Sequence, residues 1–215
     1  MKVERRHMLL YAVTDRSWLH GQSLVYAVEE VLAGGATVLQ LREKHLEHRD
    51  FLAQAQELLP LCRKYHVPLI INDDVQVALE SGADGVHVGQ SDMAVQAARS
   101  ILGPDKIIGA SAHNASEALA AVAAGADYLG CGAVFGSTTK ADAGLLSLNT
   151  LREIRAAVRV PIVAIGGINR QNIARLAGSG VDGVALISAL FAAPDKRAAA
   201  QQMLEQSLKI AGGER

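Results

Sequence analysis

Short apolar runs alternate with longer amphipathic stretches along the whole chain. The runs are rich in Val, Ile, Leu and Ala, which is typical of strands buried on both faces of a parallel sheet. They predict strands at 8–13, 37–42, 67–71, 85–88, 106–110, 127–131, 160–165 and 183–187. The stretches between them are often Ala-rich and predict helices near 22–33, 48–65, 74–81, 93–102, 115–124, 147–158, 170–177 and 195–210.

A glycine-led tripeptide precedes every second predicted strand, at Gly35–Thr37, Gly82–Asp84, Gly125–Asp127 and Gly180–Asp182. Each glycine is expected to end a helix in the left-handed conformation, and the next two residues to turn into the strand. Eight strand–helix units in 215 residues predict an α/β fold, a (β/α)8 TIM barrel of eight parallel strands forming a single domain over 1–215, with a frayed tail at 211–215. The alternative, an open doubly wound sheet, is less favoured because the pattern does not weaken at either end.

Composition narrows the class of protein. The net charge of −1 provides no basic field, so neither nucleic acid nor an anionic membrane is an expected partner. Cys62 and Cys131 lack metal-ligand spacing and indicate neither a disulfide framework nor a zinc site, which suits a reducing cytoplasm. The charged start does not resemble a secretory signal, and no apolar run approaches the ~20 residues of a membrane span. We expect a soluble cytoplasmic protein, and the sequence leaves its oligomeric state open, a homo-oligomer included.

In barrels of this kind the chemistry lies at the carboxyl ends of the strands. There the third and fourth predicted strands run into Asn72, Asp73 and Asp92. Oxygen ligands without His or Cys suit Mg²⁺, which takes one or two carboxylates together with phosphate oxygens. The alternative is that Asp73, Asp74 or Asp92 caps the following helix.

The second strand ends in a row of polar groups. Alternation places Gln40, Arg42 and Lys44 on one side, where an amide and two cations suit a polyphosphate. An ion pair of Arg42 with Glu43 or Asp15 is the alternative. On the neighbouring strands, Ser111 is expected to face the pocket as a hydrogen-bonding group, and His87 to be a hydrogen-bonded core residue rather than a ligand.

Two further segments indicate anion binding at the same end of the barrel. After the sixth strand, Ser137, Thr138 and Thr139 beside Lys140 predict a loop that grips an anion and covers the site, although a merely solvated loop would have a similar composition. Gly166 and Gly167 after the seventh strand, with a short helix after Ile187 and Ser188, predict a phosphate site made of backbone N–H groups. Two phosphorylated substrates, one of them a diphosphate, would fill these sites.

Together these motifs resemble the thiamine phosphate synthase family. Seven family-like stretches follow in order: Tyr11–Asp15, Gln40–Lys44, Asn72–Asp73, Gly85–Asp92, Gly109–His113, Thr139–Asp142 and Ile165–Ile168. The resemblance implies a Mg²⁺-dependent transferase of thiamine biosynthesis. It would join hydroxymethylpyrimidine diphosphate to a thiazole phosphate (carboxylate), giving thiamine phosphate and releasing diphosphate.

The resemblance also implies roles for single residues. Gln40, Arg42, Lys44, Asn72 and Ser111 would hold the pyrimidine diphosphate, and Asp73 and Asp92 the Mg²⁺. Ser137, Thr139, Gly167, Ile187 and Ser188 would contact the thiazole phosphate. Lys140 would contact the diphosphate, and it would be catalytic together with Arg42, Lys44 and Ser111.

Two departures and two rival functions accompany this resemblance. The family's loop usually begins with Pro-Thr where this chain has Gly136-Ser137, and Asp74 stands where the family often has Arg. A related thiazole tautomerase would need no metal pair and could use His113 as an acid–base group. A non-catalytic sensor of phosphate ligands would be expected to lose the metal carboxylates, and both are present.

Overall fold

Eight parallel strands close into a barrel in chain order in the computed structural model, which describes residues 3–19, 21–89, 93–136 and 145–212. The strands are β1 Leu10–Val13, β2 Val38–Leu41, β3 Leu69–Asn72, β4 Gly85–Val88, β5 Ile107–Ala112, β6 Tyr128–Gly132, β7 Ile162–Ile165 and β8 Gly183–Leu186. The sheet closes because β1 pairs with both β2 and β8. The predicted closed barrel is confirmed, and the open sheet is excluded.

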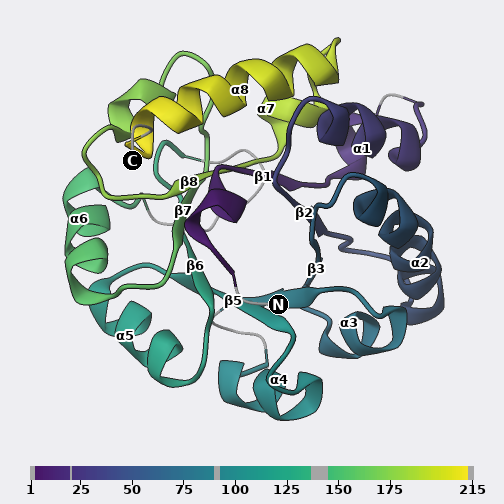
Figure 1. Ribbon diagram of the computed structural model, residues 1–215, viewed down its shortest axis with the longest axis horizontal. Helices are drawn as coiled ribbons and strands as arrows, with labels where there is room; N and C mark the ends of the chain where they lie inside the picture. The colour runs from purple at the N-terminus through teal and green to yellow at the C-terminus, as the bar shows by residue number, and fades with distance from the viewer. Residues whose placement is uncertain (1–2, 20, 90–92, 137–144, 213–215) are drawn as a thin grey trace.

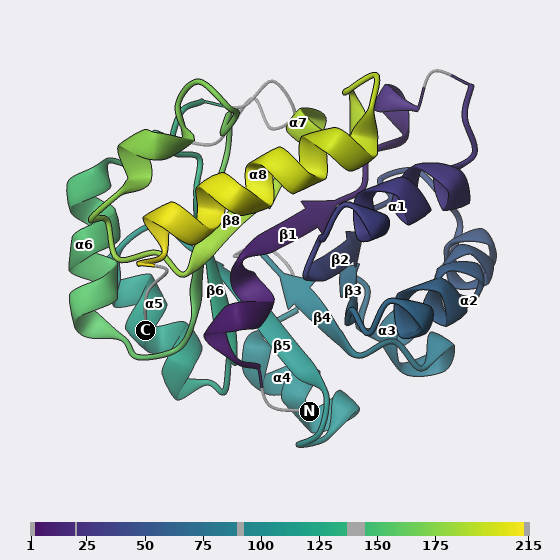
Figure 2. The same cartoon turned by 45° about the horizontal axis from the view of Figure 1, so that its top comes forward.

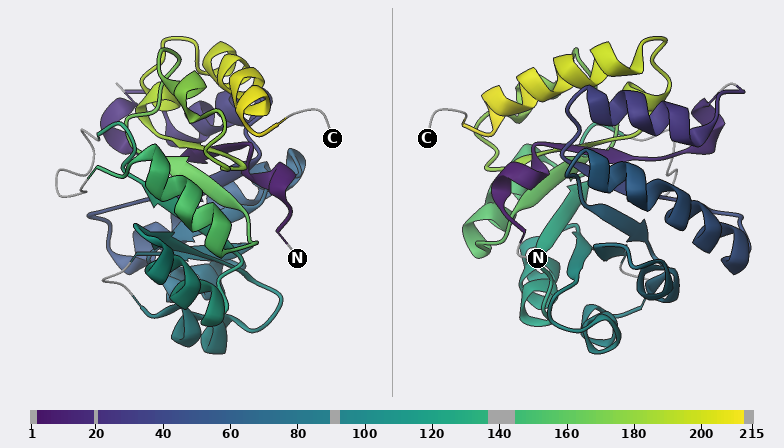
Figure 3. Two further views of the ribbon diagram at one scale, coloured as in Figure 1. Left: turned by 90° about the vertical axis from the view of Figure 1, so that its left-hand side faces the viewer. Right: turned by 45° about the vertical axis from the view of Figure 1, so that its right-hand side comes forward.

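The helices form a ring outside the strands (Figures 1 and 3). They are α1 Leu24–Ala33, α2 His48–Lys64, α3 Val75–Ser81, α4 Val95–Leu102, α5 Ala115–Ala123, α6 Leu148–Ala157, α7 Ser188–Phe191 and α8 Lys196–Ile210, with 3₁₀ turns η1 Arg5–Met8, η2 Arg16–Trp18 and η3 Ile173–Leu176. The long α8 crosses the outside of β1 and β8 (Figure 2). No helix among the described residues is long and apolar enough to cross a membrane.

The helix predicted at 170–177 is wrong, because only the short 3₁₀ turn η3 forms there. Side-chain amides satisfy the backbone of this segment in a way that competes with a helix. Asn169 Oδ1 accepts from the N–H of Gln171, and Asn172 Oδ1 accepts from the N–H of Asn169, at 2.9 and 2.8 Å.

Alternate strand positions face two separate cores. Inward-facing side chains fill the barrel, among them Tyr11, Val38, Ile70, Ile107, Tyr128 and Val163. Outward-facing ones such as Leu39, Val86 and Leu129 pack under the helices. This alternation follows from the period of two along a strand, and it sets which rim residues point into the barrel mouth.

Each glycine-led tripeptide joins two neighbouring strands at the lower end of the barrel. All four glycines have positive φ, as predicted, between 74° and 101°. The third residue does more than turn the chain, because its side chain accepts a hydrogen bond from the first or second N–H of the preceding odd strand. The pairs are Thr37 with Leu10, Asp84 with Leu69, Asp127 with Ile108 and Asp182 with Ile162, at 2.8–2.9 Å.

The N-terminal segment closes the lower end. It lies across the centre of the barrel in Figure 1, and the Met8 side chain is buried among the interior residues. Thr37 Oγ1 donates to the carbonyl of His7, and the Arg5 guanidinium pairs with Asp182 at 3.3 Å. Because residues 5–8 form η1, β1 begins at Leu10 rather than at the predicted residue 8.

Candidate active site at the barrel mouth

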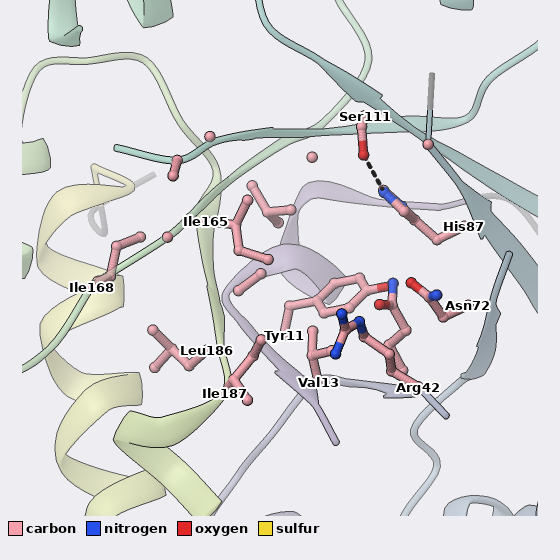
Figure 4. A pocket seen from close by; sticks show the side chains of 18 of the residues that line it. Tyr11, Val13, Arg42, Asn72, His87, Ser111, Ile165, Ile168, Leu186 and Ile187 are labelled. Atoms are coloured by element: carbon pink, nitrogen blue, oxygen red, sulfur yellow. Dashed lines mark hydrogen bonds between the residues drawn. The ribbon is translucent and has the colours of Figure 1, made fainter. Parts of the chain in front are cut away.

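A pocket opens at the carboxyl ends of the strands, and residues on or just after all eight strands line it. In Figure 4, Arg42 and Asn72 point into it from one side, while Ile165, Ile168, Leu186 and Ile187 form an apolar wall on the other. Of the residues predicted for the site, the pocket is lined by Gln40, Arg42, Asn72, Asp73, Ser111, Gly167, Ile187 and Ser188. Asp92, Ser137, Thr139 and Lys140 lie outside the described residues.

The end of β2 brings an amide and a guanidinium into the pocket. Arg42 is fixed through its backbone, whose N–H donates to Thr14 Oγ1 at 2.9 Å. Its guanidinium lies 3.9 Å from a carboxylate oxygen of Asp15. Glu43 pairs instead with Arg16 at 2.7 Å, so of the two ion pairs considered for Arg42 only the long one to Asp15 forms. Lys44 is exposed and is not among the residues lining the pocket.

A tight γ-turn after β3 presents Asp73 to the pocket. The N–H of Asp74 donates to the carbonyl of Asn72 at 2.8 Å, and Asp73 between them has φ +64°. This left-handed form is the rarer and more strained γ-turn, and such strain is concentrated at functional sites. The turn is held by the Asp73 N–H, which donates to the carbonyl of His87 at 2.8 Å. The turn therefore aims the Asp73 carboxylate at the mouth.

The next carboxylate has a different task. Asp74 Oδ1 accepts from the N–H of Val77 at 2.8 Å and caps α3, as the alternative interpretation predicted for this residue. Asp73 makes no such cap, and the side-chain amide of Asn72 donates to its Oδ2 at 2.5 Å. Of these two adjacent carboxylates, Asp74 therefore caps the helix and Asp73 lines the pocket.

The donor set at this rim suits a hard cation. Asp73 offers an exposed carboxylate beside the open pocket, and Mg²⁺ commonly takes one or two carboxylates and completes its shell with water and phosphate oxygens. Within the described residues no group of three or more His, Cys, Asp or Glu side chains forms a metal site. A single protein carboxylate with substrate oxygens is compatible with that finding.

A line of hydrogen bonds crosses the floor of the pocket. Gln40 Nε2 donates to the Tyr11 hydroxyl at 2.9 Å, and the Tyr11 and Tyr128 hydroxyls are 2.7 Å apart. His87 Nδ1 lies 3.0 Å from the Tyr128 hydroxyl, and its Nε2 lies 3.1 Å from Ser111 Oγ (Figure 4). Burial raises the pKa of both phenols above the ordinary value, so both stay protonated. His87 is hydrogen-bonded, as predicted, and it also lines the pocket.

Glycines after β7 shape the opposite side. Gly167 has φ +63°, and a Cβ there would lie 2.1 Å from the carbonyl oxygen of Gly136. The N–H groups of Val134 and Phe135 donate to the carbonyls of Ile165 and Gly166, both at 3.0 Å, which ties the segment after β6 to the glycines. The predicted short helix after β8 is α7, and Ser188 is its first residue.

The sequence reasoning missed Tyr11 and Tyr128 as pocket residues. Both are at inward positions of their strands, and tyrosine is scarce in this chain, with 4 in all. A tyrosine at an inward strand position was the available signal. Their meeting was not predictable, because β1 and β6 are not adjacent in the sheet.

Comparison with known proteins identifies the family of this site. A family model described as thiamine monophosphate synthase matches residues 10–190. The thiamine-phosphate synthase of Chloroflexus aurantiacus is 53% identical over 195 residues, covering 90% of each chain. This chain belongs to the thiamine monophosphate synthase family.

Two further family relatives agree over nearly the whole length. The thiamine-phosphate synthase of Clostridium novyi is 48% identical and covers 90% of this chain and 96% of its own. The solved thiamine phosphate pyrophosphorylase from Pyrococcus furiosus superposes with a TM-score of 0.88 at 40% identity, covering 96% of this chain and 98% of its own. The family match runs from β1 into α7, and so includes every strand that forms the pocket.

Proposed function

We propose that this protein is a thiamine phosphate synthase, a transferase that condenses hydroxymethylpyrimidine diphosphate with thiazole phosphate or its carboxylate. One observation carries the proposal: a single pocket has polar groups from β2, β3 and β5 on one side and the glycine turn with α7 on the other. That arrangement offers separate places for a diphosphate and a phosphate, in a chain 53% identical to a thiamine-phosphate synthase.

The pyrimidine diphosphate would lie on the polar side. The Arg42 guanidinium can hold two phosphate oxygens at once, and the hydroxyl of Ser111 and the amide of Asn72 can donate to others. Gln40 lies deeper, on the pocket floor. We also propose that the ammonium groups of Lys44 and Lys140 contact the diphosphate.

Asp73 and Asp92 would hold Mg²⁺, which when bound neutralises diphosphate charge and helps it to leave. The thiazole phosphate would lie at Gly167, Ile187 and Ser188, where backbone N–H groups near the start of α7 suit an anion. Ser137 and Thr139 are proposed to contact the same phosphate.

The reaction breaks the bond between the pyrimidine methylene carbon and the diphosphate oxygen, and the electron pair leaves with the diphosphate. The thiazole nitrogen then forms a bond to that carbon, and a carboxylated thiazole also loses CO₂. The protein needs no nucleophile for this, because Arg42 and Ser111 stabilise the leaving charge and the pocket orients both partners. The apolar wall of Ile165, Ile168 and Leu186 would exclude water from the cationic intermediate.

The test is thiamine phosphate formation from the two purified substrates, with and without Mg²⁺, in the wild type, Asp73→Asn and Asp74→Asn. Asn keeps the left-handed turn at 73 and the helix cap at 74, so each variant removes one charge and little structure. We expect Mg²⁺-dependent product in the wild type, a loss of roughly 100-fold in Asp73→Asn, and retained Mg²⁺ dependence in Asp74→Asn.

Other outcomes would overturn the proposal. Interconversion of the thiazole alone, without metal, would indicate the tautomerase instead. Ligand binding without turnover would indicate a sensor. We also propose a cytoplasmic location, since both cysteines are free thiols, as expected in a reducing compartment.

A further inference from the structure

The segment after β7, where η3 replaces the predicted helix, directs two asparagine side chains back onto the glycine turn of the pocket. Asn172 Nδ2 donates to the carbonyl of Gly167 at 2.8 Å, and Asn169 Nδ2 reaches the same oxygen at 3.4 Å. The other end of the Asn172 amide is also held, because its Oδ1 accepts from the N–H of Asn169 at 2.8 Å. One side chain therefore fixes the turn at two backbone groups, and the reaction proposed above gives it no task.

The carbonyl of Gly167 sets the direction of the N–H that follows it. In a planar trans peptide, the C=O of one residue and the N–H of the next point to opposite sides. With the Gly167 oxygen directed at Asn172, the N–H of Ile168 lies on the other face of the turn. Gly167 and Ile168 line the pocket, whereas Asn169 and Asn172 are not among the described residues that line it. The Ile168 N–H is therefore turned toward the pocket.

The N–H groups of this turn are available to a ligand. Among the described residues, no acceptor is bonded to the N–H of Gly167 or of Ile168, although the N–H groups of Asn169, Gln171 and Asn172 all have one. Gly167 is exposed and has φ +63°, in the left-handed region. Successive N–H groups at a left-handed residue form a concavity that suits an anion.

The segment that carries Asn172 is anchored to its surroundings. Ile173, the next residue, is fully buried in the core under the helices. The guanidinium of Arg175 lies over the Phe135 ring, 4.8 Å from its centroid, and the Phe135 N–H donates to the carbonyl of Gly166 at 3.0 Å. Packing therefore holds the asparagine in place, as the precise support of a binding group requires.

We propose that Asn172 is a positioning residue that holds the Gly167 carbonyl away from the pocket, so that the N–H groups of Gly167 and Ile168 face the phosphate of the second substrate. Without the Asn172 amide, the peptide between Gly167 and Ile168 can rotate, because glycine permits many backbone conformations, and its oxygen then repels the anion. The identity of that anion as thiazole phosphate rests on the proposed function; the orientation of the peptide does not.

The first test reads the N–H groups directly. Amide ¹H–¹⁵N signals of Gly167 and Ile168 are followed while inorganic phosphate is added. We expect both signals to move downfield to saturation in the wild type, and the phosphate concentration at half-saturation to rise about 10-fold in Asn172→Ala. Asn149→Ala, which removes an exposed amide on α6, is the matched control and should titrate like the wild type. Wild-type signals that do not move, or an unchanged half-saturation in Asn172→Ala, would overturn the proposal.

The second test separates positioning from a general structural role. We expect Asn172→Ala to raise the KM for thiazole phosphate about 10-fold and to leave the KM for the pyrimidine diphosphate within about twofold of wild type. Asn169→Ala removes only the longer bond to Gly167, together with the bond to the Gln171 N–H, and should raise the KM for thiazole phosphate less than about threefold.

Two outcomes of the kinetic test would count against Asn172 as a positioning residue. Equal increases in the two variants, or an increase shared by both substrates, would mean that the segment acts through its fold alone. If the wild type makes no thiamine phosphate, the proposed function fails, and the phosphate titration still decides the orientation of the peptide.

Discussion

Replacing the side chains that cap the odd strands should destabilise the barrel in an order set by burial. Asp182→Ala removes the acceptor of the Ile162 N–H at 2.9 Å and the partner of the Arg155 guanidinium at 3.1 Å. The Asp182 and Arg155 side chains are only 9% and 17% exposed. An orphaned buried N–H costs about 1–3 kcal/mol, and breaking a buried ion pair from one side costs about 3–5 kcal/mol. Because both costs arise at one side chain and are not additive, we expect a loss of about 3–5 kcal/mol, set by the ion pair.

Asp127→Ala is the matched comparison at the equivalent position. Its side chain is 35% exposed, and its partner Arg99 keeps hydrogen bonds to the carbonyls of Gly103, Lys106 and Gly125. Only the Ile108 N–H loses its acceptor, so the expected loss is about 1–3 kcal/mol. Asp182→Asn should lie between Asp182→Ala and the wild type, because the amide oxygen still accepts from Ile162 while the charge is gone.

Urea unfolding at 25 °C, followed by circular dichroism, measures these free energies. For a chain of this size each kcal/mol also moves the Tm by about 2–4 °C. The reasoning is refuted if Asp182→Ala loses no more than Asp127→Ala, since burial would then not set the order. Losses below about 0.5 kcal/mol in both would show that the caps contribute nothing measurable.

Three further predictions concern the pocket and the core. Gly167→Ala, whose Cβ would collide with Gly136, should raise the KM for thiazole phosphate about 10-fold in initial-rate assays; an unchanged KM would contradict the close approach seen here. Arg42→Lys should raise the KM for the pyrimidine diphosphate about 10- to 100-fold, because an ammonium cannot hold two oxygens in a fixed plane, and equal KM values would argue against bidentate binding. Burial raises the pKa of Cys62 and Cys131 to about 12, so a thiol reagent at about pH 8 should label neither until urea unfolds the chain, and rapid labelling of the native protein would refute their burial.

The sequence was sufficient to predict features that depend on local conformation or on the common direction of the strands. Apolar runs and the left-handed glycines of four turns predicted the barrel, and the common direction of parallel strands brought Gln40, Arg42, Asn72 and Ser111 to one mouth. Contacts between side chains on non-adjacent strands could not be predicted from the sequence. The contact between the two tyrosine hydroxyls across the barrel is one example.

Local competition accounts for other misses. The γ-turn at Asp73 depends on the carbonyl of His87 on the next strand, and the segment at 170–177 is decided by asparagine side chains rather than by helix period. The third residues of the glycine-led tripeptides were interpreted only as turn residues. Their side chains accept hydrogen bonds from a strand that ends many residues earlier in the chain, which the local sequence does not reveal. Propensity alone carries none of this information.

The closed lower end of the barrel bears on the order of events during turnover. Met8, Val38, Ile70 and Ile107 are buried in the barrel interior and do not line the pocket, so in the described part of the chain the pocket is closed below and has its mouth at the upper rim. Two reactants must enter and two products leave by one route. The compound that reaches the floor must arrive first, and it can depart only after the outer place is vacated, which favours an ordered sequence over a random one.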